Sequence, residues 1–160
     1  MRLTTKSRYG TRLLLDLAIY AGDKHVPLGD IARRQDISRK YLEQLIRKLK
    51  KDGLVTSRRG PFGGHMLARP PERITIGDIV RSLEETTSLT ECSESQEPYC
   101  GVCNRAGECL SRWVWFEASN AMFERLNQIT LKHLINGDHG LKSGAASPSS
   151  APPCSASRRR

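Results

Sequence analysis

The sequence predicts a mainly α-helical fold with one small β-hairpin, and two observations support this prediction. Apolar residues recur at intervals of three or four over most of residues 4–52 and 75–135, which is the spacing of a helix face. Two short apolar runs after residue 53 enclose a glycine-rich stretch at residues 60–64, which is the pattern of a hairpin. The chain has 160 residues, of which 38% are hydrophobic, so it has room for one packed domain with an appendage.

The first two helices are predicted from apolar spacing and from helix-start residues. The first covers residues 4–21, where Tyr9, Leu13 and Leu17 share one face. A loop follows, and Pro27 opens a short second helix, because proline is favoured in the first turn of a helix.

The third helix is predicted to begin after Ser38, a good N-cap residue, and to run to about Asp52. Gly53 stands at the following position, where a left-handed residue ends many helices. A tight connection at residues 35–37 joins this helix to the second, as in a helix–turn–helix. The buried face of the third helix is expected to consist of Leu42, Leu45, Ile46 and Leu49.

A hairpin is predicted directly after the third helix. Its strands are residues 54–58 and 65–69, and a turn at residues 60–64 joins them. Helices around a tight turn followed by a two-stranded hairpin predict a winged helix–turn–helix over residues 1–85.

The fourth helix closes this winged unit. Thr75 and Asp78 have the spacing of a capping box, so we expect the helix to start there.

The remainder divides into a cysteine-rich sensor loop (residues 86–109), a dimerisation helix with a terminal short helix (110–137) and a disordered tail (138–160). Thr130 is the expected cap of the short helix. Trp113 and Trp115 lie on different sides of the long helix, so we expect one of them to face a second copy of the chain.

Charge is distributed unevenly, although the formal net charge is +9. Residues 1–73 hold 17 Lys and Arg against 7 Asp and Glu, whereas residues 74–140 hold 5 against 10. A basic half indicates that this half meets a polyanion, and a winged helix–turn–helix makes double-stranded DNA the expected one. The alternative is an ordinary solvated surface with a chance imbalance.

The expected DNA contacts come from the start of the third helix, which would point at base edges in the major groove, and from the hairpin tip, which would enter the minor groove. The alternative is that these residues form only the wet face of an amphipathic helix. The candidate DNA-binding residues are Ser38, Arg39, Lys40, Tyr41, Glu43, Gln44, Arg58, Arg59, Gly60 and Pro61.

Four of the five cysteines, Cys92, Cys100, Cys103 and Cys109, lie close together. The chain begins without the apolar stretch of a secretory signal and holds no apolar run long enough to span a bilayer. We therefore expect a cytoplasmic protein that does not associate with a membrane. Metal or redox use is then favoured over a structural disulfide. An iron–sulfur cluster, a zinc site that uses the Cys100-x-x-Cys103 spacing, and a thiol switch all remain open.

Four segments together give the chain a family likeness: residues 1–9 (MRLTTKSRY), 37–45 (ISRKYLEQL), 53–55 (GLV) and 59–64 (RGPFGG). In order and spacing they resemble the Rrf-two family of IscR-like and NsrR-like regulators, over about residues 1–136. The resemblance implies a winged-helix homodimer on pseudo-palindromic DNA, joined by a long C-terminal helix. It also implies an iron–sulfur cluster in the loop before that helix.

The resemblance further implies the ligands of this cluster, [2Fe–2S] or [4Fe–4S]. Cys92, Cys103 and Cys109 match the three family cysteines, with a longer first spacing. The fourth ligand departs from the family pattern, because Arg112 stands where IscR-type members have histidine and Arg8 where NsrR-type members have an acidic residue. Cys100 is the candidate for that position, and Glu108 is a second.

The sequence therefore predicts a DNA-binding transcriptional regulator, a repressor, whose operator binding is tuned by an iron–sulfur cluster. The alternative is a regulator of the same family without a cluster, controlled by zinc, thiol redox, or a ligand or partner. No nucleophile, base and orienting group occur together, so we expect no enzyme and no catalytic residues. A thiol oxidoreductase that uses Cys100 and Cys103 lacks the expected βαβ context, and an iron–sulfur carrier would not need a basic hairpin beside a basic helix.

Overall fold

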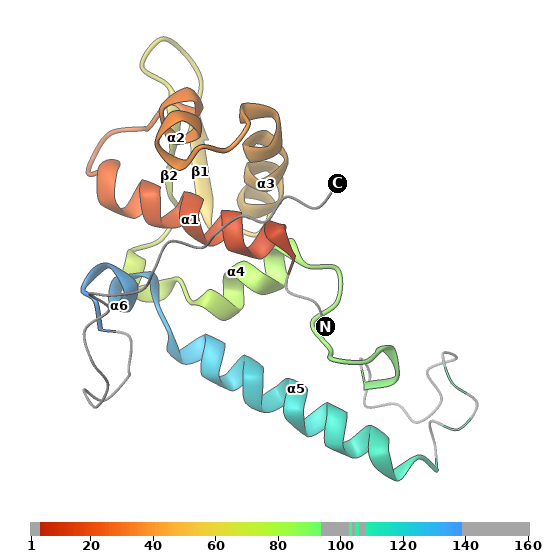
Figure 1. The fold of residues 1–160 in the computed structure, drawn as a ribbon. Helices are drawn as coiled ribbons and strands as arrows, with labels where there is room; N and C mark the ends of the chain where they lie inside the picture. Colours follow the sequence, from red (N-terminus) through yellow and green to blue (C-terminus); the bar gives the residue numbers. More distant parts are fainter. Residues whose placement is uncertain (1–3, 94–102, 104, 106–107, 139–160) are drawn as a thin grey trace, which may run out of the picture.

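The computed structural model describes residues 4–93, 103, 105 and 108–138. Helices α1 to α4 and the hairpin form one packed unit, here called the head. Helix α5 runs below α4, on the side of the head opposite the hairpin (Figure 1). The elements in order are α1 (Thr5–Tyr20), α2 (Leu28–Gln35), α3 (Arg39–Lys51), β1 (Val55–Arg58), β2 (Gly64–Leu67), the 3-10 turn η1 (Pro71–Arg73), α4 (Ile76–Leu83), the 3-10 turn η2 (Glu91–Ser93), α5 (Leu110–Gln128) and α6 (Leu131–Ile135).

The predicted helix caps are confirmed. The hydroxyl of Ser38 accepts a hydrogen bond from the backbone N–H of Tyr41 at 3.3 Å. Thr75 and Asp78 form both hydrogen bonds of a capping box, and Thr130 caps α6. Gly53 adopts a φ of +66°, the left-handed conformation expected after α3. These local features fix where the head turns from one element to the next.

The hairpin, called the wing below (residues 55–67), is joined to the rest of the head by backbone. Its strands are antiparallel, with Val55 opposite Leu67 at the base. His65 and Val26 exchange two backbone hydrogen bonds, each 2.8 Å long. The second strand starts at residue 64, one residue earlier than predicted, and its pairing ends at Leu67. The wing is therefore held to the α1–α2 loop as well as to α3.

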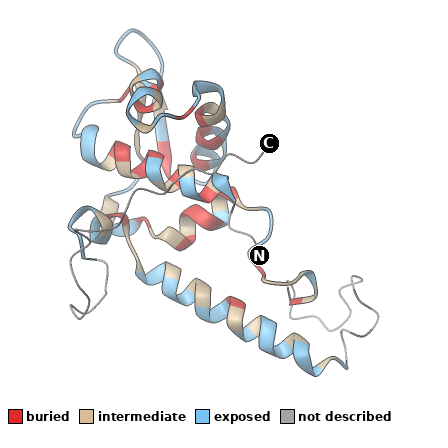
Figure 2. Cartoon of the chain, viewed as in Figure 1, coloured by how far each residue is buried: buried red, intermediate tan, exposed pale blue. Residues whose placement is uncertain are grey.

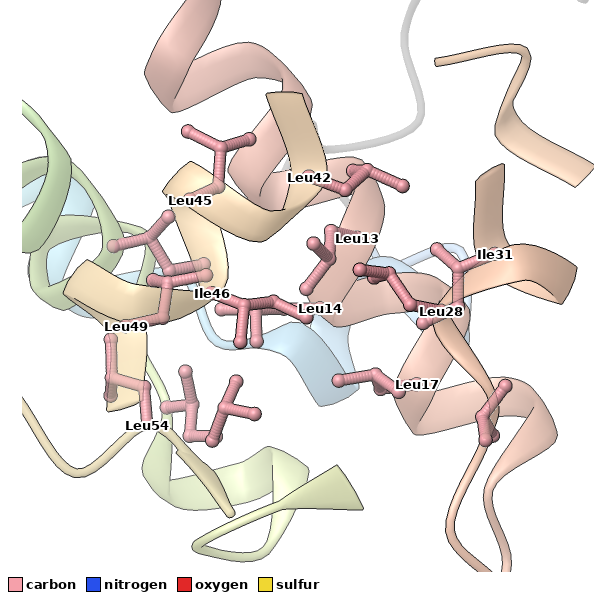
Figure 3. Packing of buried hydrophobic residues seen from close by; sticks show 14 of the residues in the cluster. Leu13, Leu14, Leu17, Leu28, Ile31, Leu42, Leu45, Ile46, Leu49 and Leu54 are labelled. Carbon is pink, nitrogen blue, oxygen red and sulfur yellow. The ribbon is translucent and has the colours of Figure 1, made fainter. Parts of the chain in front are cut away.

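Leucine and isoleucine side chains from the first three helices meet in one core (Figure 3). The predicted face of α3 is buried in full. Figure 2 shows that burial is concentrated in the head, whereas α5 is largely exposed. The labelled core residues are Leu13, Leu14, Leu17, Leu28, Ile31, Leu42, Leu45, Ile46, Leu49 and Leu54.

A buried ion pair fixes α2 against α1. The carboxylate of Asp16 has no exposed surface and lies 2.6 Å and 3.0 Å from two guanidinium nitrogens of Arg34. The side-chain amide of Gln35 donates a third hydrogen bond to it at 2.9 Å. The Arg34 guanidinium also lies over the ring of Tyr20, 4.4 Å from its centre. This network sets the position of α2, on which the orientation of the helix–turn–helix depends.

Arg81 of α4 contacts two residues of α5. Arg81 donates a hydrogen bond to the side-chain oxygen of Asn127 and lies 5.5 Å from the ring centre of Phe123. Gly77 allows this approach, because a Cβ atom there would be 1.9 Å from Asn127 Oδ1. After α5 the chain returns to the head, where Leu131 is fully buried. Within the described residues, no helix combines the length and the apolar character needed to cross a bilayer.

Candidate DNA interface and cysteine segment

The start of α3 carries the predicted base-contacting residues on its exposed side. Arg39, Lys40 and Gln44 are exposed, and Glu43 is half-buried. Arg39 and Glu43 form an ion pair one turn apart, with Nε and Oε1 separated by 3.3 Å. The guanidinium most suited to guanine is thus already paired with a carboxylate, so contact with a base requires the pair to open or to act together.

Tyr41 differs from its neighbours because its ring is packed. The ring lies edge-on to that of Tyr9, with 5.8 Å between the ring centres. Its hydroxyl lies 3.3 Å from the hydroxyl of Thr5. Tyr41 therefore holds the start of α3 against α1, and only its hydroxyl remains for a phosphate or base.

Two further cations, which were not among the predicted DNA-binding residues, lie beside this cluster. The guanidinium groups of Arg8 and Arg12 lie 5.4 Å and 5.6 Å from the ring centre of Tyr9. Both side chains belong to exposed residues of α1. Cation–π contact of this kind orients an arginine without neutralising it, so the positive surface extends from α3 onto α1. The sequence carries a signal for this contact, because Arg8 is adjacent to Tyr9 and Arg12 follows it by three positions, the spacing of neighbours on a helix.

The tip of the wing carries the remaining candidates. Arg58, Arg59, Gly60 and Pro61 are all exposed. A hydrogen bond of 2.9 Å from the N–H of Gly63 to the carbonyl of Gly60 closes the turn. The tip and the start of α3 lie at the same end of the head, opposite α5 (Figure 1). The arrangement can present a helix and a cationic hairpin to neighbouring grooves of a duplex.

One basic residue near the end of α3 contacts the neighbouring helix α4. The ammonium of Lys48 donates a hydrogen bond to the carbonyl of Leu83 at the end of α4, at 3.4 Å. Lys48 thus links α3 to α4.

The described cysteines are free thiols in different settings. Cys92 lies in η2 and is half-buried, with its sulfur 3.4 Å from the Thr90 hydroxyl. Cys103 is exposed. Cys109 is the residue before α5 and makes no side-chain capping hydrogen bond; a hydrogen bond from Ser111, at 3.1 Å, is the main cause of the lowered pKa of its thiol. A lowered pKa favours the thiolate, the form that binds metals.

Arg112 takes part in a contact that brings two thiol-bearing segments together. Its Nε donates a hydrogen bond to the backbone carbonyl of Cys92, at 2.6 Å. The residue that replaces the family histidine thus joins η2 to the first turn of α5. In the part of the chain that the structure describes, no three Cys, His, Asp or Glu side chains are grouped to hold a metal ion. Cys100, the fourth candidate ligand, lies outside the described residues.

Comparisons with known proteins agree with this architecture. The family model described as "Rrf2: Iron-dependent Transcriptional regulator" matches residues 3–137. Protein rrf2 of Nitratidesulfovibrio vulgaris is 50% identical over 135 residues, which cover 84% of this chain and 87% of that protein. The regulator IscR of Yersinia pseudotuberculosis is 40% identical over 136 residues, covering 85% and 80%.

A solved structure shows the same fold. CymR, the global cysteine regulator of B. subtilis, superposes with a TM-score of 0.68 at 36% identity, over 86% of this chain and 98% of that one. The family and these relatives are transcriptional regulators and not enzymes. The predicted winged helix–turn–helix is confirmed, and the chain belongs to the Rrf2 family, the family that the sequence resembles.

Proposed function

We propose that the protein is a cytoplasmic repressor that binds a pseudo-palindromic operator as a homodimer. Whether it releases or retains the operator depends on whether an iron–sulfur cluster is bound. The observation that carries the DNA part is that exposed cations of α3 and of the wing lie at one end of the head. In this proposal α3 enters the major groove and the wing enters the minor groove. Two-fold symmetry then places two α3 helices about 34 Å apart along the duplex.

The base-contacting residues are those on the first turns of α3. Lys40 and Gln44 project freely, and Ser38 keeps its hydroxyl proton for an acceptor on DNA because its oxygen accepts from Tyr41. Arg59 at the wing tip addresses the minor groove. Phosphate contacts made by lysine and arginine give affinity without sequence preference, whereas base contacts give the preference.

Salt dependence tests this assignment. Arg39→Ala and Arg59→Ala are each expected to weaken binding to a duplex selected from a random library. A variant that loses a phosphate contact lowers the slope of log affinity against log salt by about 0.9. Arg73→Ala, which removes an exposed arginine of η1, outside α3, the wing and α5, is the matched control and is expected to change neither quantity. Wild-type affinity and slope in both test variants would contradict the proposed surface.

The proposed dimer covers the exposed side of α5. This helix has 19 residues, of which only Ser119 is buried. Leu110, Trp113 and Trp115 are 90%, 67% and 45% exposed. A mainly apolar hollow of about 400 Å³ lies beside the helix, between α1, α4 and Leu126. A second copy of the chain buries the exposed apolar side chains of α5, because large exposed apolar patches mark interaction sites.

Mass measurement in solution tests the dimer. The full chain is expected to have the mass of two copies, and Trp113→Glu is expected to give one copy because it places a charge in the apolar contact. A wild-type monomer at micromolar concentration would contradict this part of the proposal.

The proposed cluster is held by Cys92, Cys103 and Cys109, with Cys100 as the fourth ligand. Thiolates are soft anionic donors and suit iron–sulfur clusters, and the lowered pKa of Cys109 favours that form. The cluster, when bound, supplies sensitivity to iron supply and oxidation. The chain itself connects the site to α5, through the hydrogen bond from Arg112 to the carbonyl of Cys92.

Anaerobic purification with iron and sulfide analysis tests the cluster, followed by comparison of operator affinity with and without it. Replacement of each proposed ligand by serine is expected to remove the visible absorbance, whereas Cys154→Ser, at the remaining cysteine, retains it. Equal operator affinity of the two forms would contradict the regulatory role and leave DNA binding intact.

A cluster-free regulator is the second candidate. The similar protein CymR is named for cysteine and not for iron. Under this alternative the purified protein is colourless, and zinc, thiol oxidation, or a ligand or partner changes its affinity for DNA.

A further inference from the structure

The wing tip carries an exposed aromatic side chain that the functions above do not use. Phe62 is 92% exposed, more than any of the other exposed large hydrophobic residues in the described part of the chain. Phenylalanine adds nothing to a tight turn that a small or polar residue would not provide. An exposed aromatic side chain at the end of a hairpin is available to a partner that can cover it.

The turn holds Phe62 outward on a firm support. Pro61 and Phe62 are the two central residues of a turn closed by the hydrogen bond from Gly63 to Gly60. Gly60 has a φ of +113°, which favours glycine, and a Cβ atom on Gly63 would be 2.3 Å from the carbonyl oxygen of Arg58. The pair of 2.8 Å hydrogen bonds between Val26 and His65 anchors the hairpin further down. The position of Phe62 is therefore set by the backbone.

The charges around Phe62 identify the kind of partner. Arg58 and Arg59 are exposed just before the turn. A hollow of about 440 Å³ beside the tip is lined by Lys24, Arg58, Asp23 and Phe62 itself, among other residues. With Arg59, the cations around this apolar side chain outnumber the one carboxylate, and the combination fits a polyanion that also offers apolar faces. Duplex DNA has both, since its phosphates surround stacked bases.

The position of the tip agrees with this partner. It projects at the same end of the head as the start of α3, whereas α5, the surface proposed for the second copy, lies at the opposite end (Figure 1). A duplex that receives α3 thus runs past the tip, and the dimer contact leaves the tip uncovered.

We propose that Phe62 is an apolar wedge that inserts partly between two stacked base pairs in the minor groove beside each half-site. The inference rests on the proposed DNA binding and adds a deformation of the duplex to it. Pyrimidine–purine steps unstack most easily, so the operator is expected to carry a TA or CA/TG step under the wing. The wing then contributes sequence preference without a hydrogen bond to a base.

Bending and base stacking test the wedge with the full chain. The probe is the duplex that the wild-type chain selects from a random library, labelled at both ends for energy transfer and with 2-aminopurine at the step under the wing. Phe62→Ala is expected to weaken binding about tenfold and to remove both the bend and the fluorescence increase. Phe62→Leu, which keeps an apolar wedge, retains most of each. Ile19→Ala, at another exposed apolar residue, changes none of them.

The outcomes separate the wedge from DNA binding itself. The slope of affinity against salt is expected to stay at the wild-type value in Phe62→Ala, because no charge is lost. Wild-type binding with an unchanged bend in Phe62→Ala overturns the wedge and leaves the proposed function standing. Weaker binding with an unchanged bend and fluorescence also overturns it. If the wild-type chain selects no duplex, the proposed function falls together with the wedge.

Discussion

Replacement of Gly64 by alanine tests whether backbone contact holds the wing in place. A Cβ atom at this position would lie 2.4 Å from the carbonyl oxygen of Val26 and 2.5 Å from its carbonyl carbon. Both neighbours are backbone atoms in a loop that is paired to the wing, so neither can rotate away. The wing and the α1–α2 loop must therefore separate.

The size of the effect follows from the distances. Ordinary contacts of a Cβ atom begin near 3.4 Å, so relief requires a shift of about 1 Å. That shift breaks the two 2.8 Å hydrogen bonds between Val26 and His65. Each such bond contributes about 1 kcal/mol net, and part of the burial of Val26 is lost as well. We expect the free energy of unfolding to fall by about 2–3 kcal/mol and the melting temperature by about 5–10 °C.

Denaturant unfolding followed by circular dichroism measures this change, with Gly29→Ala as the matched control. A Cβ atom at Gly29 meets no heavy atom within 4 Å, and the residue lies in the first turn of α2. Alanine is the better helix former, so the control is expected to be unchanged or more stable by up to about 1 kcal/mol. An unfolding midpoint for Gly64→Ala equal to that of the wild type would refute the reasoning.

Three further predictions concern stability. Asp16→Asn is expected to lower the free energy of unfolding by about 3 kcal/mol, measured in urea, because Arg34 loses its buried partner; a change below about 1 kcal/mol would show that the pair is dispensable. Burial opposes ionisation of Glu84, but hydrogen bonds from Ser7 and Thr4 outweigh it and lower its pKa below 4.5. Stability is then present above pH 4.5 and lost as the pH falls through the lowered pKa; Glu84→Gln removes this loss, and an unaltered acid transition would contradict the assignment. Burial, with Lys50 and His25, lowers the pKa of His65 below 6.5, so the unfolded chain takes up this proton first and stability falls as the pH drops below 6.5. The fall is expected to be smaller in His65→Gln, and an identical pH profile would argue against it.

The elements that local chemistry decides were predictable from the sequence. Ser38, Thr75 and Gly53 each act within one helical turn, so the start and end positions they predict agree with the structure. The hairpin follows from a glycine-rich turn between two apolar runs, and it differs from the prediction only at the ends of its strands. The predicted interior face of α3 follows from a period that only a helix produces.

Features that depend on distant residues were not predictable. Asp16 lies within an apolar stretch of α1, and nothing near it in sequence indicates that Arg34 would reach it. Tyr41 was expected to face DNA because of its position on α3, whereas its ring packs on Tyr9, 32 residues earlier. The sequence shows that four cysteines share one segment, but their spacing does not determine how a long loop folds or which thiols come together. The predicted ligand set therefore stays a prediction.

The described contacts nevertheless form a continuous connection from the cysteine segment to α4. Arg112 at the start of α5 holds the carbonyl of Cys92. Farther along α5, Asn127 receives the hydrogen bond from Arg81 of α4. A change in the loop around Cys92 is therefore applied to one end of a 19-residue helix whose other end is fastened to the head.

From α4 the connection reaches both elements proposed to meet DNA. Lys48 of α3 holds the carbonyl of Leu83, and Glu84 accepts hydrogen bonds from Thr4 and Ser7 at the start of α1. Because α4 is fastened on both sides, a rotation of α5 in the proposed dimer would turn each head as a unit and alter the separation of the two heads, while the start of α3 keeps its own structure. Regulation by this proposed route would change operator affinity through geometry, and a coupling of about 1–3 kcal/mol is enough to change it between five- and a hundredfold. Contiguity alone does not create such coupling, which requires two discrete arrangements of the α4–α5 joint.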